Sequence, residues 1–192
     1  MVLDVAQIVP DTEAEGPGRR FAVWVKGCPL RCAGCCNPQM LHFGGGTPTD
    51  PEALAARVLA TPGIEGLSLL GGEPFAQAEA CAVLAGAVRR GGLGVMVYSG
   101  FTLEALQAKT EPGVRTLLDA TDLLVDGPYQ RAQPERERRW IGSANQRMHF
   151  FGDRYRPDDP RFRAGNTVEL RFKNGELVVN GWPALAAALL AR

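Results

Sequence analysis

The chain has 192 residues, 45% of them hydrophobic and 22% charged, and its 21 lysines and arginines are balanced by 21 aspartates and glutamates. This composition excludes a disordered or fibrous chain, and the length predicts one domain, residues 1–192, with a substantial core. Balanced charge without a basic tail argues against nucleic acid or an anionic membrane as the main partner.

The N-terminal segment, residues 1–16, lacks the positively charged start and the apolar run of a secretory signal. Nowhere does the sequence approach the roughly 18 consecutive apolar residues that span a membrane. We therefore expect a soluble, cytoplasmic protein. In a reducing compartment, clustered cysteines are more often metal ligands or catalytic thiols than a disulfide framework.

The first predicted elements surround a cysteine cluster. Residues 20–27, RFAVWVKG, form an apolar run rich in strand formers, and the cysteines follow it directly, so they lie in a loop after a strand. Residues 47–60 predict a helix that Thr49 or Asp50 caps and that has Pro51 in its first turn.

Strands and helices then alternate along the chain. The pattern predicts strands at 64–74, 93–100 and 121–128 and helices at 77–92 and 102–109. These apolar runs are too continuous for strands that expose one face to solvent. The alternation therefore predicts an α/β fold in which helices cover a parallel sheet.

The C-terminal part departs from this rhythm. Residues 168–181 place Asn174-Gly175 between two strand-like runs, which predicts a β-hairpin, and residues 182–192 predict an apolar helix. The charged segment 128–139 is interpreted as a solvated loop or, alternatively, as a mobile segment that faces a partner.

The four clustered cysteines are Cys28, Cys32, Cys35 and Cys36. Thiolates bind zinc, copper(I) or iron–sulfur clusters. A zinc site with Cys36 as its fourth ligand would require adjacent thiolates on one ion, and no second ligand pair lies at a suitable distance. Three thiolates in one tight loop are instead enough for three irons of a [4Fe–4S] cluster, which leaves the fourth iron open.

The other two cysteines and the two histidines are not assigned as ligands. Cys36 is not expected to bind the cluster, and Cys81 lies on an apolar helical run, where a cysteine is usually a small buried hydrophobe. His42 and His149 are expected to be structural or surface residues.

The Cys28-x3-Cys32-x2-Cys35 motif resembles that of the radical S-adenosylmethionine enzymes. The resemblance implies a partial (β/α)6-type barrel of parallel strands. It also implies S-adenosylmethionine bound at the open iron and cleaved to a 5′-deoxyadenosyl radical. The GGEP motif, Gly71, Gly72, Glu73 and Pro74, resembles the family's glycine-rich motif, in which a carboxylate meets the methionyl ammonium.

Further polar motifs lie at the ends of predicted strands. Ser99 lies at the end of the strand predicted at 93–100, Asp126 lies near the end of the strand predicted at 121–128, and the motif at 142–147 follows an expected fifth strand. Carboxyl ends of parallel strands meet at one edge, so these motifs are expected to converge on one cavity. Taken singly, the same residues are also typical of turns, helix caps and surface ion pairs.

Within the superfamily, the chain most resembles the activating enzymes of anaerobic ribonucleotide reductase. The resembling segments are GCPLRCAGCCNP, GGEPFAQ, YSGFTLEAL, LLVDGPY and WIGSANQR, which span residues 27–147. The resemblance implies that Asp126, Ser143, Asn145 and Arg147 belong to the cofactor-side wall, with Asp126 serving a monovalent cation or the methionyl group. It implies a glycyl-radical enzyme as partner and a flavodoxin- or ferredoxin-type electron donor.

Two alternatives remain open. One keeps the radical chemistry but directs it at a peptide or small molecule of a biosynthetic pathway. The other is a non-enzymatic, zinc-stabilised interaction module.

Overall fold

The computed structural model describes residues 1–173 and 176–182. The strands are β1 (Leu3–Thr12), β2 (Arg20–Val25), β3 (Thr47–Thr49), β4 (Gly66–Gly71), β5 (Gly94–Tyr98), β6 (Leu123–Asp126), β7 (Arg147–Phe150), β8 (Val168–Lys173) and β9 (Glu176–Gly181). The helices are α1 (Pro51–Leu59), α2 (Ala78–Arg90), α3 (Leu103–Gln107) and α4 (Val114–Asp119), and short 3-10 turns are η1 (Pro38–Met40), η2 (Pro74–Gln77) and η3 (Pro160–Arg163). Across the described ranges, every helix falls short of the length and apolar character that a membrane crossing requires.

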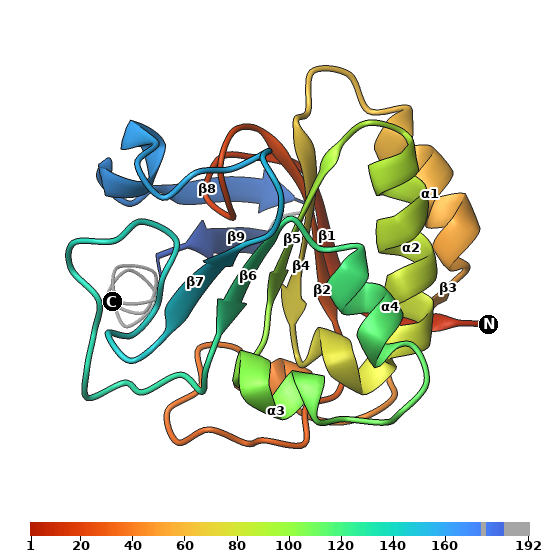
Figure 1. The fold of residues 1–192 in the computed structure, drawn as a ribbon, viewed down its shortest axis with the longest axis horizontal. Helices are drawn as coiled ribbons and strands as arrows, with labels where there is room; N and C mark the ends of the chain where they lie inside the picture. The colour runs from red at the N-terminus through yellow and green to blue at the C-terminus, as the bar shows by residue number, and fades with distance from the viewer. Residues whose placement is uncertain (174–175, 183–192) are drawn as a thin grey trace.

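Seven strands form one sheet in the order β3-β1-β2-β4-β5-β6-β7. Its centre, β2-β4-β5-β6, is parallel, whereas β1 and β7 pair antiparallel with the strands beside them. Figure 1 shows α1, α2 and α4 together on one side of this sheet and the hairpin β8–β9 on the other. The predicted α/β class, the parallel strands and the C-terminal hairpin are confirmed.

The two faces of the sheet follow from the period-two alternation of side chains along each strand. On β2, Phe21 and Val23 join the core beneath the helices, while Trp24 belongs to a separate cluster on the opposite face. On β5, Val97 faces the helices and Met96 faces away from them. We call these the helix face and the inner face.

Several elements differ from the sequence-based expectation. Residues 47–49 pair with β1 as the strand β3, which was not expected, whereas the predicted helix cap is confirmed: α1 begins at Pro51 and the Asp50 side chain caps it. An irregular loop replaces the expected fifth strand, and β7 begins only at Arg147. The parallel part therefore comprises four strands rather than the six of the expected barrel.

The strands β1 and β7 and the helix α4 were not expected from the sequence. The predicted hairpin turn, Asn174-Gly175, and residues 183–192 of the helix predicted over 182–192 lie outside the described residues.

Candidate functional site

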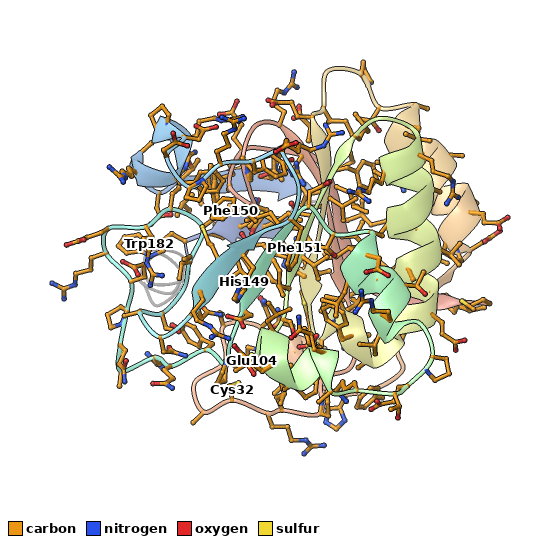
Figure 2. The ribbon with its side chains drawn as sticks, in the orientation of Figure 1. Cys32, Glu104, His149, Phe150, Phe151 and Trp182 are labelled. Carbon is orange, nitrogen blue, oxygen red and sulfur yellow. The ribbon has the colours of Figure 1, made fainter. Side chains whose placement is uncertain are left out.

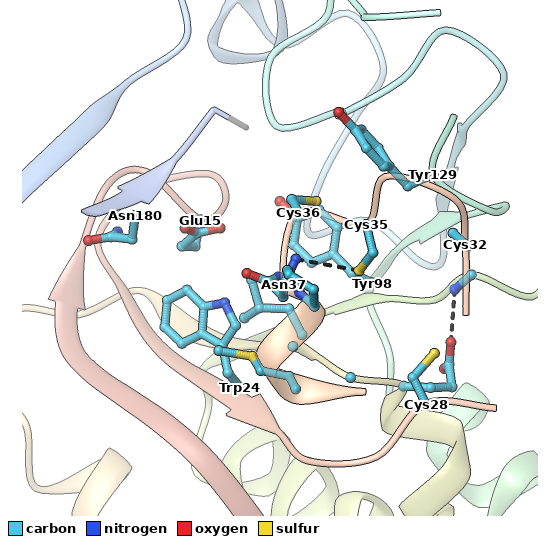
Figure 3. Close-up of a pocket in the computed structure, with 18 of the residues that line it drawn as sticks. Glu15, Trp24, Cys28, Cys32, Cys35, Cys36, Asn37, Tyr98, Tyr129 and Asn180 are labelled. Atoms are coloured by element: carbon cyan, nitrogen blue, oxygen red, sulfur yellow. Dashed lines mark hydrogen bonds between the residues drawn. The ribbon is translucent and has the colours of Figure 1, made fainter. Parts of the chain in front are cut away.

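A cavity of about 570 Å³ lies against the inner face of the sheet. Its walls come from the cysteine loop, the carboxyl ends of β4 and β5, the loop between β6 and β7, and β9 (Figure 3). Sequence segments from both ends of the chain therefore meet at one site. In the wider view, Cys32 lies at the end of the sheet where α3 and Glu104 are also found (Figure 2).

The cysteine loop is held at its base by backbone hydrogen bonds. The Gly27 N–H donates to the Met40 carbonyl at 2.8 Å, and the Cys28 N–H donates to the Leu41 carbonyl at 3.0 Å. Inside the loop, Arg31 has φ +47°, a left-handed conformation that allows the chain to turn tightly between the cysteines. The ordered base thus presents Cys28, Cys32, Cys35 and Cys36 to the cavity.

The cysteine loop offers several thiols to one cavity. In a [4Fe–4S] cluster each cysteine binds a different iron, so the thiols need not converge on a single ion. Burial raises the pKa of the Cys28 and Cys35 thiols, so a bound cation is needed to keep them as thiolates at neutral pH.

The other two cysteines differ in position. Cys81 is fully buried in the core on α2, as its apolar surroundings predict. Cys36 is exposed and lines the cavity beside the three candidate ligands, so its side chain is available to a ligand there.

The GGEP motif lies directly against the cysteine loop. The Gly72 N–H donates to the Val25 carbonyl at 2.7 Å, and the Glu73 N–H donates to the Gly27 carbonyl at 2.9 Å. Gly71, Gly72 and Glu73 line the cavity, whereas Pro74 is buried at the start of η2 and does not. The motif therefore sets how close Glu73 lies to the cysteine loop.

Glu73 is a fully buried carboxyl that organises this rim. It accepts hydrogen bonds from the Gly100 N–H at 2.8 Å, the Ser99 hydroxyl at 3.0 Å and the Phe75 N–H at 3.0 Å. Burial raises the pKa of Glu73 to about 7, and these hydrogen bonds oppose the rise. Glu73 and Ser99, which were each expected at the cofactor site, thus contact each other directly at the cavity wall.

Asp126 and Arg147 do not line the cavity. Because Asp126 has the same parity on β6 as Leu124, its side chain lies on the helix face, away from the cavity. There it accepts a hydrogen bond from the Leu103 N–H at 2.6 Å, pairs with Arg147, and lies 3.0 Å from the imidazole Nε2 of His149.

Ser143 and Asn145 also lie outside the cavity lining. The Ser143 hydroxyl accepts a hydrogen bond from the Gln130 N–H at 3.0 Å, and the Asn145 side chain donates to the Pro128 carbonyl at 2.8 Å. They brace the loop that follows β6. The neighbouring Gln146 does line the cavity, and its side chain donates to the Gly127 carbonyl at 3.0 Å.

Several cavity residues were not expected from the sequence. Tyr98 could have been found from strand alternation, because it shares the inner face of β5 with Met96. Glu15 comes from the loop after β1, and Asn180 and Trp182 come from β9 and the residues after it. No local pattern marks these last three, because chain reversals far from the motifs place them here.

Comparison with known proteins supports one family. Residues 14–149 match the sequence profile of a family described as a 4Fe-4S single cluster domain. The anaerobic ribonucleoside-triphosphate reductase-activating protein of Pasteurella multocida is 31% identical over 159 residues, which cover 78% of this chain and 98% of that protein. The Vibrio cholerae protein of the same name is 32% identical over 154 residues, covering 76% and 96%.

A partial structural likeness was also found. The crystal structure of QueE from Escherichia coli matches 53% of this chain and 54% of its own chain, with a TM-score of 0.44 and 16% identity. That likeness is too weak to support an inference. From the sequence matches, this chain belongs to the family of anaerobic ribonucleoside-triphosphate reductase-activating proteins and contains its 4Fe-4S single cluster domain.

Proposed function

We propose that the chain activates a glycyl-radical enzyme of the anaerobic ribonucleotide reductase type, with Cys28, Cys32 and Cys35 as the ligands of a [4Fe–4S] cluster. The observation that carries the proposal is the meeting of three loop thiols and Glu73 in one cavity. When bound, the cluster and S-adenosylmethionine supply one-electron cleavage of the sulfonium and a 5′-deoxyadenosyl radical, which takes a hydrogen atom from a glycine of the partner.

The chain's own residues bind and orient the cofactor. Three thiolates leave one iron of a four-iron cluster without a protein ligand, which provides room for the amino and carboxylate groups of S-adenosylmethionine. Glu73 lies beside the cysteine loop, where its ionised carboxylate would attract the methionyl ammonium. Gly71 and Gly72 let the backbone approach the ligand closely.

In this proposal, the other residues that were predicted to bind the cofactor act indirectly. Pro74 starts the turn after Glu73, and Asp126, Ser143, Asn145 and Arg147 hold the loops that border the cavity. Ser99 contacts Glu73 directly and keeps its carboxyl oriented. We assign no monovalent cation to Asp126, because its carboxylate already accepts hydrogen bonds from Arg147 and from the Leu103 N–H.

The proposal includes a flavodoxin- or ferredoxin-type electron donor, since reducing the cluster requires a low-potential source of one electron. It also keeps the expected cytoplasmic location, because free cysteines persist in a reducing compartment. Radical modification of another peptide or a small molecule is the competing function. A zinc module does not agree with the 4Fe-4S family to which the chain belongs.

The deciding experiment mixes reduced protein, S-adenosylmethionine and the anaerobic ribonucleotide reductase of the same organism. The expected result is a glycyl radical doublet in electron paramagnetic resonance on the reductase, lost when its acceptor glycine is changed to alanine. If 5′-deoxyadenosine forms without the doublet and responds instead to another peptide or metabolite, the competing function replaces this one.

A further inference from the structure

The cavity has a second polar end that the cluster and the GGEP motif do not use. Glu15, from the loop between β1 and β2, and Asn180, on β9, lie beside each other there (Figure 3). Both are well buried, with 8% and 4% of their surfaces exposed. They come from opposite ends of the chain, and Asn180 lies beyond the segment 14–149 that matches the family profile.

Asn180 offers an unused hydrogen-bond acceptor. Its side-chain Nδ2 donates to the Thr12 hydroxyl at 3.0 Å and to the Glu169 carboxylate at 3.5 Å, and the carboxylate, which only accepts, sets the orientation of the amide. The Oδ1 atom is buried and has no hydrogen-bond partner among the described residues, although Asn180 lines the cavity. A buried acceptor left without a partner is costly, so a donor brought by a ligand would be favoured here.

Glu15 presents a carboxyl group that favours its neutral form. Burial raises the pKa of Glu15 to about 8, while the Gly181 N–H and the Asn180 side chain partly oppose the rise. Its backbone is fixed because the Ser68 hydroxyl donates to the Glu15 carbonyl at 2.6 Å. A neutral carboxyl both donates and accepts hydrogen bonds.

The wall that carries Asn180 is held in place by polar contacts. The Glu13 N–H donates to the Glu169 carboxylate at 2.9 Å, and the Arg139 guanidinium donates to the Thr167 hydroxyl at 2.7 Å. The Trp140 N–H also donates to the Asn166 side chain at 3.0 Å. These hydrogen bonds join the hairpin and the residues before it to two separate loops, and they hold this wall of the cavity in place.

We propose that Glu15 and Asn180 form a subsite for a backbone amide of the partner segment that carries the acceptor glycine. A peptide group supplies an N–H for Asn180 Oδ1 and a carbonyl for the Glu15 hydroxyl, and it brings no charge into a buried end of the cavity. A carboxylate or phosphate ligand would meet a buried carboxyl and is disfavoured. This inference rests on the proposed function, because it assigns the subsite to the same partner.

The test measures equilibrium binding of a fluorescent peptide that copies the glycine-bearing segment of the anaerobic ribonucleotide reductase. Binding is measured to the reconstituted protein with S-adenosylmethionine present. A set of analogues replaces one backbone amide at a time with an ester, which removes a single N–H. With the wild-type protein, one analogue should bind about tenfold more weakly than the parent peptide.

The variants identify the residues responsible. Asn180→Leu should bind the parent peptide about tenfold more weakly and should no longer distinguish it from that ester analogue. Glu15→Leu should also lose affinity, whereas Glu15→Gln, which stays neutral and polar, should keep most of it. Phe172→Leu is the matched control, because Phe172 is on the same hairpin and 82% exposed, and it should bind as the wild type does.

Two results would overturn the subsite. One is an ester effect of equal size in the wild type and in Asn180→Leu. The other is a loss of S-adenosylmethionine affinity with unchanged peptide affinity, which would assign this end of the cavity to the cofactor. If Asn180→Leu fails to fold, Glu15→Leu provides the same comparison from the opposite side. Failure of the glycyl radical doublet with normal peptide binding would instead count against the proposed function.

Discussion

Arg147 on β7 lies directly opposite Asp126 on β6, and its guanidinium donates to both oxygens of the Asp126 carboxylate, at 3.0 and 2.5 Å. The same carboxylate accepts from the Leu103 N–H at the start of α3. Burial alone would raise the pKa of Asp126, but hydrogen bonds from Arg147 and Leu103, together with the His149 imidazole nearby, outweigh it and hold the pKa below its usual range. The pair therefore joins β7 to the segment that follows Ser99.

Asp126→Ala should destabilise the fold by about 2 kcal/mol, because it leaves the partly buried Leu103 N–H without an acceptor. Since the folded-state pKa is depressed, the contribution of Asp126 is present above the unfolded pKa and is lost as pH falls through the folded value. Melting temperatures of the wild type and the variant should thus differ at pH 7 and converge at acid pH. Glu104→Gln, at an exposed partner of Arg147, should change little, and an equal loss there would contradict the assignment.

Replacing the cluster cysteines gives the second prediction. The wild-type protein, reconstituted without oxygen, should bind about four irons and four sulfides. Alanine at Cys28, Cys32 or Cys35 should abolish the cluster, whereas alanine at Cys36 or Cys81 should retain it. Iron and sulfide analysis with visible absorption spectra measures this. A full cluster in Cys32→Ala would refute the ligand set.

Much of this arrangement could be predicted because it is local in the sequence. The cysteine spacing, the glycines after β4 and the helix cap at Asp50 each depend on neighbouring residues. For Asp126, only part of the prediction was correct. Asp126 lies at the carboxyl end of β6, as expected, but the face of the sheet to which its side chain points depends on the register of β6. That register places the side chain against the start of α3 rather than in the cavity.

The second polar end of the cavity could not be predicted for a related reason. Glu15 and Asn180 are far apart in the sequence, and a turn and a hairpin bring them together. Neither has a periodic or spaced partner nearby. Only the antiparallel pairing of β1 with β2 and the return of the hairpin onto the sheet place them at one wall.

Replacing Glu73 should weaken S-adenosylmethionine binding without changing the iron content of the protein. Glu73→Ala removes the acceptor of the Ser99 hydroxyl and the Gly100 N–H, so the rim of the cavity loses its organising group. We expect at least about tenfold weaker cofactor binding with an unchanged iron content. Ser99→Ala removes one of three donors and should have a smaller effect. Equal cofactor affinity in Glu73→Ala and the wild type, measured by equilibrium dialysis, would be the contrary result.

The titration of Glu15 should lower the free energy of unfolding as the pH rises. Its pKa is raised from the usual 4.5 to about 8, chiefly by burial, so its contribution is fully present below the unfolded value. That contribution is lost towards pH 8, at up to about 1.4 kcal/mol per pH unit. Nearby titratable groups on other elements are Glu169, Tyr98 and Cys36.

Glu15→Gln removes this single titration and leaves the neighbouring groups in place. Relative to the wild type, the variant should gain thermal stability steadily between pH 5 and pH 8. Melting temperatures across this range measure the difference. A constant difference at all pH values would show that Glu15 keeps an ordinary pKa.

Gly72 tests how closely the GGEP motif and the cysteine loop must approach. A Cβ at Gly72 would lie 2.3 Å from the Gly27 carbonyl oxygen and 2.8 Å from its carbon, both of them backbone atoms. Because backbone cannot move aside as a side chain does, Gly72→Ala must push the two loops apart. Glu73 would then move away from the cysteines, since its N–H is bonded to that same carbonyl.

We therefore expect Gly72→Ala to weaken S-adenosylmethionine binding by at least about tenfold and to lower the melting temperature by several degrees. The change in the cluster's electron paramagnetic resonance spectrum on cofactor addition reports the binding. Gly86→Ala on α2 is the matched control, because the nearest atom to its Cβ is the flexible end of Arg90 at 3.2 Å and alanine favours a helix. It should bind the cofactor as the wild type does. Normal cofactor binding in Gly72→Ala would mean that the contact between Gly72 and Gly27 does not position Glu73, and that the cysteine loop is oriented by its hydrogen bonds to Met40 and Leu41 alone.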